Sequence, residues 1–372
     1  MEKGSNRIAP VDGLRALAVL GVIWAHVWSF CGNPSLVVGR FRGVPLDLQR
    51  VVSLIGTGVD LFFVISGFCM YFMYIRRQTT LDWGNYAVFI KRRWLRLSPG
   101  FYMAALVCAA GLWLSGRPFP SKDLFAHGTF THTIFPGTGQ LAAPLWSLAT
   151  EWHFYLLLPF LIWASVRWGF GRVLVVLMIA SVGFRLWMYQ HAESAVALWK
   201  SQLPPRLIEF CWGIWIARWV VQERPLPRVL QGRQGFLVGL LVAYAGRLLM
   251  TTEIIRWAGR AGVLSQVMAE PVLTLGYGLM LWNVVVSPSS FANALSWPAS
   301  QAIGRWSYSL YLWHWWPCWF ISRTLTHHLG SSLSTQYLAF FLLLAVLLPV
   351  GWLSYKWLEA PYFRKSQTGS ST

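Results

Sequence analysis

Charged side chains are scarce in this sequence. They make up 12% of the 372 residues, and only 13 residues are Asp or Glu. A soluble protein usually has about a quarter of its residues charged, and without them a surface of this size would not stay hydrated. The shortage excludes an ordinary soluble enzyme. The lack of carboxylates also argues against a divalent metal site, so we expect no bound metal.

Cysteine is also rare, and several familiar motifs are missing. The five cysteines are far apart, lie mostly in apolar runs and have neither metal-ligand nor disulfide spacing. We therefore expect small buried apolar side chains and no disulfide scaffold. The sequence contains no Walker, Rossmann, zinc or nucleophile-elbow motif. Its two halves do not align as a repeat, which disfavours an inverted-repeat transporter.

Apolar and aromatic residues are abundant instead. Apolar residues account for 56% of the chain, with 24 Trp, 13 Tyr and 23 Phe. Aromatic side chains suit membrane interfaces, where one edge of the ring is wet and the other is not. The net charge of +18 is spread between apolar runs. This pattern predicts contact with the lipid bilayer and with an anionic small molecule, and no nucleic-acid partner.

Apolar runs long enough to cross a bilayer recur along the whole chain. The candidate spans are 11–30, 56–75, 97–115, 144–166, 171–190, 205–222, 235–252, 262–286, 303–323 and 336–356. We therefore predict an all-α polytopic membrane protein of about ten transmembrane helices, in one domain over residues 1–372. The first run carries charges and has no small-residue cleavage site, so we expect a retained span and no signal peptide.

The distribution of Lys and Arg predicts the orientation. The basic residues are densest before the first span, around residues 76–96 and 218–233, and after the last span. By the positive-inside rule, both termini are predicted to be cytoplasmic. The long segments 31–55 and 116–143 then lie outside, and loops of this length are often functional.

Arg15 and His26 are the first candidate functional residues. They are eleven residues apart, which places them on one helix face about 16 Å apart along the axis. An anion held by Arg15 could reach His26 along the same helix wall. The spacing alone slightly favours the other interpretation, a snorkelling arginine and a hydrogen-bonded core histidine.

Two further segments place charges at or inside apolar spans. Asp60 lies in GVDLFFVISGF, where it either pairs with an arginine or orients a catalytic imidazole. The run KRRWLRLSP contains Arg92, Arg93 and Arg96. Such a basic cluster usually serves topology and lipid contact, but Arg93 and Arg96, three residues apart, could also clamp a phosphate.

Glu151 enters the apolar span 144–166 beside Trp146, Ser147 and Tyr155. A carboxylate in that environment must be paired, hydrogen-bonded or protonated. With His26 it would form an acid/base pair if the two helices touch.

Other polar residues in the spans have simpler explanations. Arg206 and Glu209 are three residues apart, which predicts an ion pair within one helix. Ser307, Tyr311 and His314 form a polar stripe that either lines a cavity or joins helices. The span 262–286 is weakened by Glu270 and the proline after it.

Taken together, these segments resemble the acyltransferase 3 family of integral membrane acyltransferases. The matching pieces are DGLRALAVLGVIWAH, GVDLFFVISGF, KRRWLRLSP, LWSLATEWHFYLLLP, PRLIEFCWGIWIA and IGRWSYSLYLWHWW, in family order. The family often has an acidic residue and Gln where this chain has Trp152 and His153, so His153 is given no catalytic role. The resemblance implies O-acylation, usually O-acetylation, of a bacterial surface or secreted polysaccharide. It also implies the stand-alone type without a fused hydrolase-like domain.

The resemblance also implies roles for residues. His26 would be the general base or would carry the acyl group. Glu151 would orient the acceptor hydroxyl or support His26. Asp60 would support these residues from the layer of side chains around them. The phosphates of acetyl-CoA, the acyl donor, would be held on the cytoplasmic side by Arg15, Arg92, Arg93 and Arg96. The carbohydrate acceptor, on the outer side or in the membrane, would meet Trp146, Ser147, Tyr155 and His314, although the aromatic residues could equally be packing.

The resemblance therefore implies a membrane O-acetyltransferase of the bacterial cytoplasmic (inner) membrane. A non-enzymatic carrier or flippase for an acylated or lipid-linked saccharide is the main alternative, because it would keep the same intramembrane charges and aromatic residues. It would not need an anion-binding arginine on the same helix face as a histidine. A membrane scaffold is a third possibility.

Overall fold

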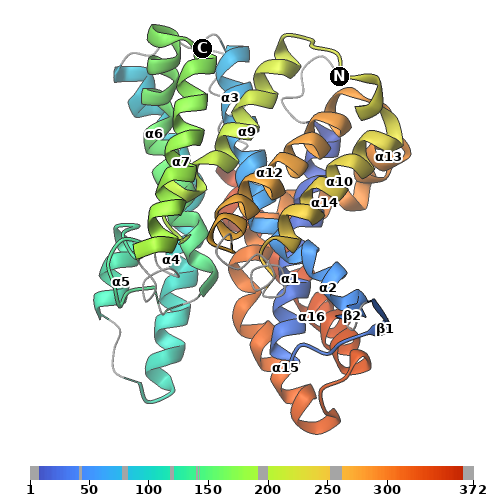
Figure 1. Ribbon diagram of the computed structural model, residues 1–372. Helices are drawn as coiled ribbons and strands as arrows, with labels where there is room; N and C mark the ends of the chain where they lie inside the picture. Colours follow the sequence, from blue (N-terminus) through green and yellow to red (C-terminus); the bar gives the residue numbers. More distant parts are fainter. Residues whose placement is uncertain are drawn as a thin grey trace. The chain divides into compact units, whose positions relative to one another are not determined.

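The structure is a computed structural model that describes residues 8–41, 44–77, 83–117, 121–139, 141, 143–191, 200–251 and 262–362. These residues are helical nearly throughout (Figure 1). Seven described helices are long and apolar enough to cross a membrane: Ala9–Phe30, Ile55–Ile75, Gly84–Leu114, Ala143–Trp168, Phe170–His191, Gly262–Val286 and Leu333–Tyr362. The predicted all-α architecture with several membrane-spanning helices is confirmed. The number ten and the position of the termini stay predictions.

The chain divides into two compact units. Unit 1 contains Phe63–Ala292, and unit 2 contains Ala9–Phe62 and Asn293–Thr372. The main helices of unit 1 are most of α3 (Gly58–Arg77), α4 (Trp83–Leu114), α5 (Ser121–Gly128), α6 (Trp146–Trp168), α7 (Phe170–His191), α9 (Leu203–Val221), α10 (Gly232–Leu248) and α12 (Gly262–Val286). Short 3₁₀ turns at Ala143–Leu145 and Arg228–Leu230 precede α6 and α10.

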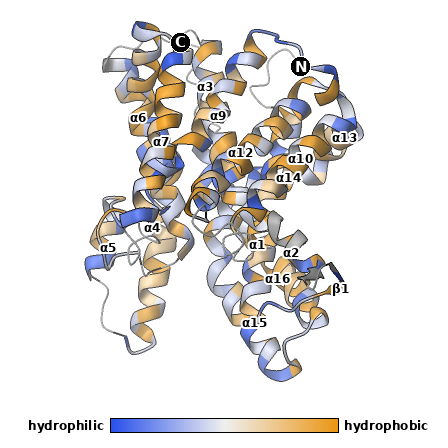
Figure 2. Ribbon diagram, in the orientation of Figure 1, coloured by the Kyte–Doolittle hydropathy of each residue, from blue (hydrophilic) through white to orange (hydrophobic). Residues whose placement is uncertain are grey.

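Within unit 1, α12 is the central helix and α7 is peripheral. α12 packs against α7, α9 and α10, and its polar residues Thr274 and Asn283 are fully buried. In contrast, α7 exposes apolar side chains such as Val176 and Ile179, which are 63% and 65% exposed. Figure 2 shows how hydrophobic both helices are. An apolar face left open in this way is expected where a helix contacts lipid.

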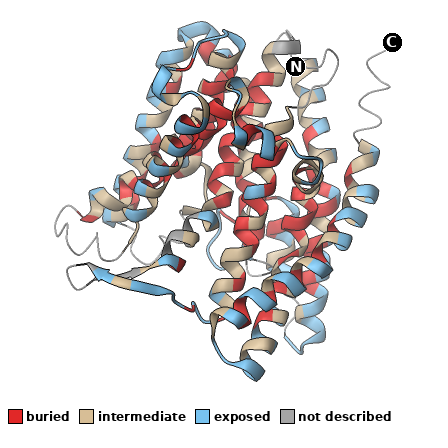
Figure 3. Cartoon of the chain, turned by 90° about the vertical axis from the view of Figure 1, so that its right-hand side faces the viewer, coloured by how far each residue is buried: buried red, intermediate tan, exposed pale blue. Residues whose placement is uncertain are grey.

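Unit 2 is built around α1 (Ala9–Phe30). Before α13 (Ser290–Leu295) its other elements are β1 (Val37–Phe41), β2 (Val44–Asp47), α2 (Leu48–Val52), the turn Ser53–Thr57 and the first residues of α3. After them come the last residues of α13, α14 (Pro298–Trp313), α15 (Trp315–Leu329), α16 (Leu333–Ser354) and the π-helical turn Tyr355–Glu359. The strands pair antiparallel, and the chain exposes Val37 and Val38 there (Figure 3). This hairpin was not predicted from the sequence.

Two of the contacts between α14 and the rest of unit 2 show how closely it is packed. α14 lies so close to α1 that a Cβ on Gly304 would sit 1.9 Å from the backbone oxygen of Asp12. Only a glycine permits this approach between two helix backbones. At the other side, Ser309 Oγ donates to Glu359 Oε1 across 2.6 Å, and both side chains are buried.

The predicted span 303–323 is wrong as one continuous helix. α14 ends at Trp313 and α15 begins at Trp315, so His314 lies at the junction. Pro317 is the physical reason, because it has no N–H for the carbonyl of Trp313 and its ring would clash with that carbonyl. The predicted span 97–115 also differs: α4 begins at Trp83, so the basic cluster around Arg93 belongs to the same helix.

The contact at Gly304 gives a first prediction. Replacing Gly304 by Leu should separate α1 from α14 and destabilise the protein by about 1–3 kcal/mol, as overpacking does. A thiol-reactive dye during heating measures this, because four of the five free cysteines are buried. Gly111→Leu is the matched control, since nothing lies within 4 Å of a Cβ there. An unchanged transition for Gly304→Leu would contradict the close packing.

Candidate functional site

His26 is held by a hydrogen bond to a second histidine in unit 2. Its Nδ1 lies 3.2 Å from Nε2 of His314, and Nδ1 of His314 lies 2.6 Å from the carbonyl oxygen of Tyr311. His314 is fully buried, whereas His26 is half-buried. The ring of Trp315 packs edge-on against His26, with centroids 5.1 Å apart. The structure therefore brings together two predicted site residues that are 288 positions apart.

Arg15 has an acidic partner that the sequence analysis did not assign. Its Nη1 lies 3.1 Å from Oδ1 of Asp12, one turn earlier on α1, and Asp12 is 5% exposed. An Asp in the first turn also interacts favourably with the helix dipole. Asp60, in the first turn of α3, is buried as well. The Nδ1 atom of His26 contacts His314, so the orientation of this imidazole by Asp60 gains no support from the geometry.

Glu151 is the centre of a second polar cluster, in unit 1. Its Oε1 accepts hydrogen bonds from Ser66 Oγ at 2.8 Å and from Tyr155 Oη at 2.5 Å. The guanidinium carbon of Arg93 lies 5.9 Å from the ring centre of Tyr155. These contacts join α3, α4 and α6. Ser66 was not a predicted site residue.

The predicted basic cluster divides between two faces of α4. Arg93 is 8% exposed and also stacks over the ring of Phe89 at 5.5 Å. Arg96 is half-buried, whereas Arg92 is exposed. Arg93 and Arg96 thus share the inward side of α4, and Arg92 points away from it. The binding of phosphate by these residues stays a prediction.

Trp146 and Ser147 make local contacts at the start of α6. The guanidinium of Arg206 lies 5.2 Å from the ring centre of Trp146, and Ser147 Oγ donates to the carbonyl oxygen of Pro144. Arg206 also pairs with Glu209 at 2.9 Å, which confirms the ion pair predicted within this helix. The contact of Trp146 and Ser147 with an acceptor stays a prediction.

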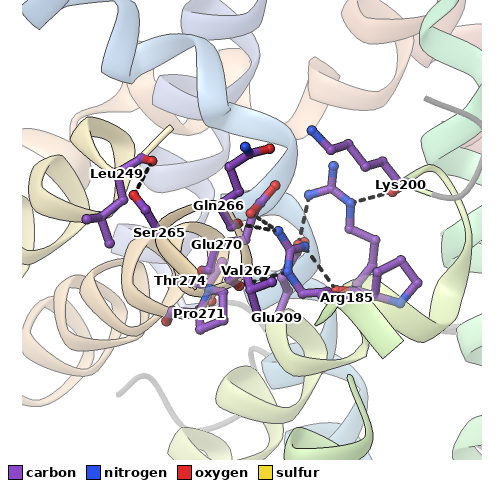
Figure 4. A network of polar contacts seen from close by, with 12 residues as sticks. Arg185, Lys200, Glu209, Leu249, Ser265, Gln266, Val267, Glu270, Pro271 and Thr274 are labelled. Carbon is purple, nitrogen blue, oxygen red and sulfur yellow. Dashed lines mark hydrogen bonds and ion pairs between the residues drawn. The ribbon is translucent and has the colours of Figure 1, made fainter. Parts of the chain in front are cut away.

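A buried network around Arg185 was missed by the sequence analysis (Figure 4). Arg185 on α7 is fully buried and forms an ion pair with Glu270 on α12. Its Nε also donates to the carbonyl of Val267, and Nη1 points to the carbonyl of Pro205 at the start of α9. The fully paired guanidinium thus connects three helices of unit 1, and it has a structural role.

Two histidines in the segment 121–139 stack face to face. The rings of His127 and His132 have centroids 3.9 Å apart and an angle of 3° between their planes. Both side chains are buried. His127 Nδ1 donates to the carbonyl of Asp123 at 2.7 Å, and His132 Nε2 lies 3.2 Å from the carbonyl of Leu145.

The environment keeps this pair neutral. Burial lowers the pKa of His127 below its usual range. Burial, together with the neighbouring His127, lowers the pKa of His132 to about 3. The charged form of either ring is disfavoured because it would lose hydration and face the other imidazole.

Comparison with known proteins identifies the family. The chain matches the family described as "Acyltransferase domain" over residues 8–356. It belongs to the acyltransferase 3 family. This confirms the resemblance expected from the six motifs, and with the apolar helices it makes the chain a multi-pass membrane protein of that family.

Two relatives of this acyltransferase 3 chain illustrate its similarity. It is 28% identical over 212 residues to Nodulation protein 10 of Rhizobium leguminosarum bv. viciae, covering 51% of this chain and 53% of the relative. It is 24% identical over 400 residues to the O-acetyltransferase OatA of Staphylococcus aureus (strain NCTC 8325 / PS 47), covering 97% of this chain and 58% of the relative. The chain thus spans about half the length of these relatives. No solved structure matches.

The structure places the predicted site residues in two groups. His26, His314, Arg15 and Asp60 belong to unit 2, whereas Glu151, Tyr155, Trp146, Ser147, Arg92, Arg93 and Arg96 belong to unit 1. The pairing of His26 with Glu151 therefore stays a prediction. Within each group, the side chains meet as described above.

The histidine stack predicts a pH-dependent stability. When residues 121–139 unfold locally, both histidines regain pKa values of about 6.5 and bind more protons than in the folded segment. The free energy of this local unfolding should therefore decrease as pH falls from about 6.5 towards 3. Hydrogen exchange of residues 121–139 at pH 7.5 and 5.5, corrected for the intrinsic rate, measures this. His127→Asn with His132→Gln, which keep the donor positions without titrating, is the control and should show little pH dependence. Equal pH dependence in both proteins would refute the prediction.

Proposed function

We propose that this chain is a membrane O-acyltransferase of the bacterial cytoplasmic membrane. It transfers an acetyl group from cytoplasmic acetyl-CoA to a hydroxyl of a surface or secreted polysaccharide, or of its lipid-linked precursor. The observation that carries the proposal is the half-buried imidazole of His26, held by His314 within a membrane-spanning helix of an acyltransferase 3 chain. The name of the relative OatA, an O-acetyltransferase, supports the reaction type.

An imidazole in this position can act as a general base. The acceptor oxygen attacks the thioester carbonyl carbon, so a C–O bond forms and the C–S bond breaks. His26 takes the proton of the hydroxyl and returns it to the thiolate of CoA, which leaves as the free thiol. General base catalysis of this kind contributes about 10² to 10⁴ in rate.

The basic residues of α4 fit the donor. Acetyl-CoA carries several phosphate charges, and paired arginines bind phosphate through charge-assisted hydrogen bonds. Arg93 and Arg96 lie on one side of α4, with Arg92 on its exposed side. Arg15, in unit 2, is a separate candidate for a donor phosphate, and Asp12 partly offsets its charge.

The cluster around Glu151 fits the acceptor. A carboxylate that accepts bonds from Ser66 and Tyr155 on Oε1 keeps Oε2 to orient a sugar hydroxyl. Tyr155 is 1% exposed, which favours support of Glu151 over stacking on a sugar. Trp146 is half-buried and offers a ring face of the kind that sugars stack on.

His26 provides the first test of the proposal. His26→Ala should lower transfer by at least about 100-fold, because the base is lost. Release of CoA from acetyl-CoA is measured in nanodiscs, with and without an extract containing polysaccharide and lipid-linked saccharides. His191→Ala is the control, since His191 is exposed at the end of α7. Extract-dependent release that persists in His26→Ala would exclude the assigned base. No release by the folded wild type would favour the carrier.

The donor site provides the second test. Arg93→Gln and Arg96→Gln should each weaken CoA binding about tenfold, because a charged hydrogen bond contributes about 1.5–3 kcal/mol. Calorimetric titration of CoA into the nanodiscs measures the affinity. Arg172→Gln is the control, since Arg172 is an exposed arginine of α7. Arg93→Lys keeps the charge and serves as the second variant if Arg93→Gln does not fold. If the affinity for CoA is unchanged in all variants, the cluster serves membrane topology and lipid contact, and the donor-binding role is refuted.

A further inference from the structure

The carbonyl of Tyr311 determines which nitrogen of His314 carries its proton. Its oxygen lies 2.6 Å from Nδ1 of His314. A carbonyl oxygen only accepts hydrogen bonds, so Nδ1 of His314 must be the protonated nitrogen.

The proton position of His314 also determines that of His26. With its proton on Nδ1, neutral His314 presents a lone pair at Nε2, 3.2 Å from Nδ1 of His26. Nδ1 of His26 is therefore the donor, and Nε2 of His26 carries the free lone pair.

The reverse arrangement would require a doubly protonated His314. This side chain is fully buried, and within the described part of the chain neither imidazole has a carboxylate partner. A buried cation without a counter-charge is strongly disfavoured. The bond between the two rings thus runs from His26 to His314.

Aromatic packing fixes the orientation of the His26 ring. Trp315 lies edge-on to it at 85°, and Phe30 lies nearly parallel to it at 27°, with centroids 5.1 and 6.3 Å away. A half-turn of the imidazole would replace Nδ1 by a carbon and break the bond to His314. Only His26 is accessible to a substrate, because His314 is completely buried.

We infer that His314 is a positioning residue for acyl transfer: it accepts the Nδ1 proton of His26 and thereby makes Nε2 of His26 the nitrogen that takes the acceptor's hydroxyl proton. This inference rests on the proposed function. It replaces the role predicted for His314 from the sequence, contact with the acceptor, because a fully buried side chain does not reach one.

The proton balance of the step explains why His314 affects turnover. When the hydroxyl oxygen attacks the thioester, its proton moves to Nε2 of His26, and the ring becomes an imidazolium. The bond from Nδ1 to His314 is then charge-assisted and stronger than in the neutral state. The Nε2 proton passes to the CoA thiolate, which restores both neutral rings. His314 thus stabilises the charged ring more than the resting one, which raises kcat and leaves the donor KM unchanged.

Two substitutions at His314 separate its hydrogen bond from its volume. His314→Leu fills the space without an acceptor, whereas the amide oxygen of His314→Gln can take the place of Nε2. We expect His314→Leu to lower kcat about 100-fold with the KM for acetyl-CoA changed less than about twofold, and His314→Gln to recover at least about tenfold of that loss. Trp313→Phe is the control for structural damage at the junction, because it removes only the bond from Trp313 Nε1 to Ser354 Oγ.

The outcomes distinguish this inference from the proposed function. If His26→Ala abolishes transfer while His314→Leu retains the kcat of Trp313→Phe, the positioning role is refuted and the base assignment stands. Equal losses in His314→Leu and His314→Gln, with unchanged thermal stability, also refute it. If the wild type transfers no acetyl group, the proposed function itself fails.

A spectroscopic measurement tests the inference without turnover. Nitrogen-15 spectra of histidine-labelled protein in nanodiscs, with His26→Ala for assignment, should show His26 protonated at Nδ1 in the wild type. In His314→Leu, a population protonated at Nε2 should appear. An Nε2-protonated His26 in the wild type would overturn the inference, whatever the activity of the variants.

Discussion

The hydrogen bond between Nδ1 of His314 and the carbonyl oxygen of Tyr311 is the contact on which the geometry around His26 depends. Pro317 has no N–H for the carbonyl of Trp313, so α14 ends there and His314 follows at the junction with α15. At this junction the imidazole donates to the carbonyl of Tyr311. The order of protons along the two rings follows from that bond. One contact with the backbone thus controls the chemistry of a side chain 288 positions away from His314.

Polar groups among the apolar helices obey the same requirement for partners. Glu151 is held by two hydroxyl groups, and Arg185 by Glu270 and backbone carbonyls. The difference lies in what remains for other molecules. All nitrogens of Arg185 have acceptors inside unit 1, which makes it a connection between helices. His26 uses Nδ1 for the protein and is half-buried, as a group that reacts must be.

The sequence predicted the helices well because the length and apolar character of a run depend only on neighbouring residues. It also predicted the ion pair between Arg206 and Glu209, which is local to one helix. Contacts between distant segments, such as Arg185 with Glu270, depend on how helices pack and could not be derived from spacing. The β-hairpin was missed because two short strands have no strong periodicity. The break at His314 could have been found, since Pro317 is visible four residues after Trp313.

The bond between Ser309 and Glu359 involves a residue beyond the part of the chain that matches the family. Similarity to the family stops at residue 356, within the turn that follows α16. The carboxylate of Glu359 lies beyond that point, is 2% exposed and accepts from α14. Packed residues of unit 2 therefore extend past residue 356, the last residue that matches the family. A truncation at residue 356 would leave the hydroxyl of Ser309 without this acceptor inside the protein and would loosen α14, which His314 directly follows.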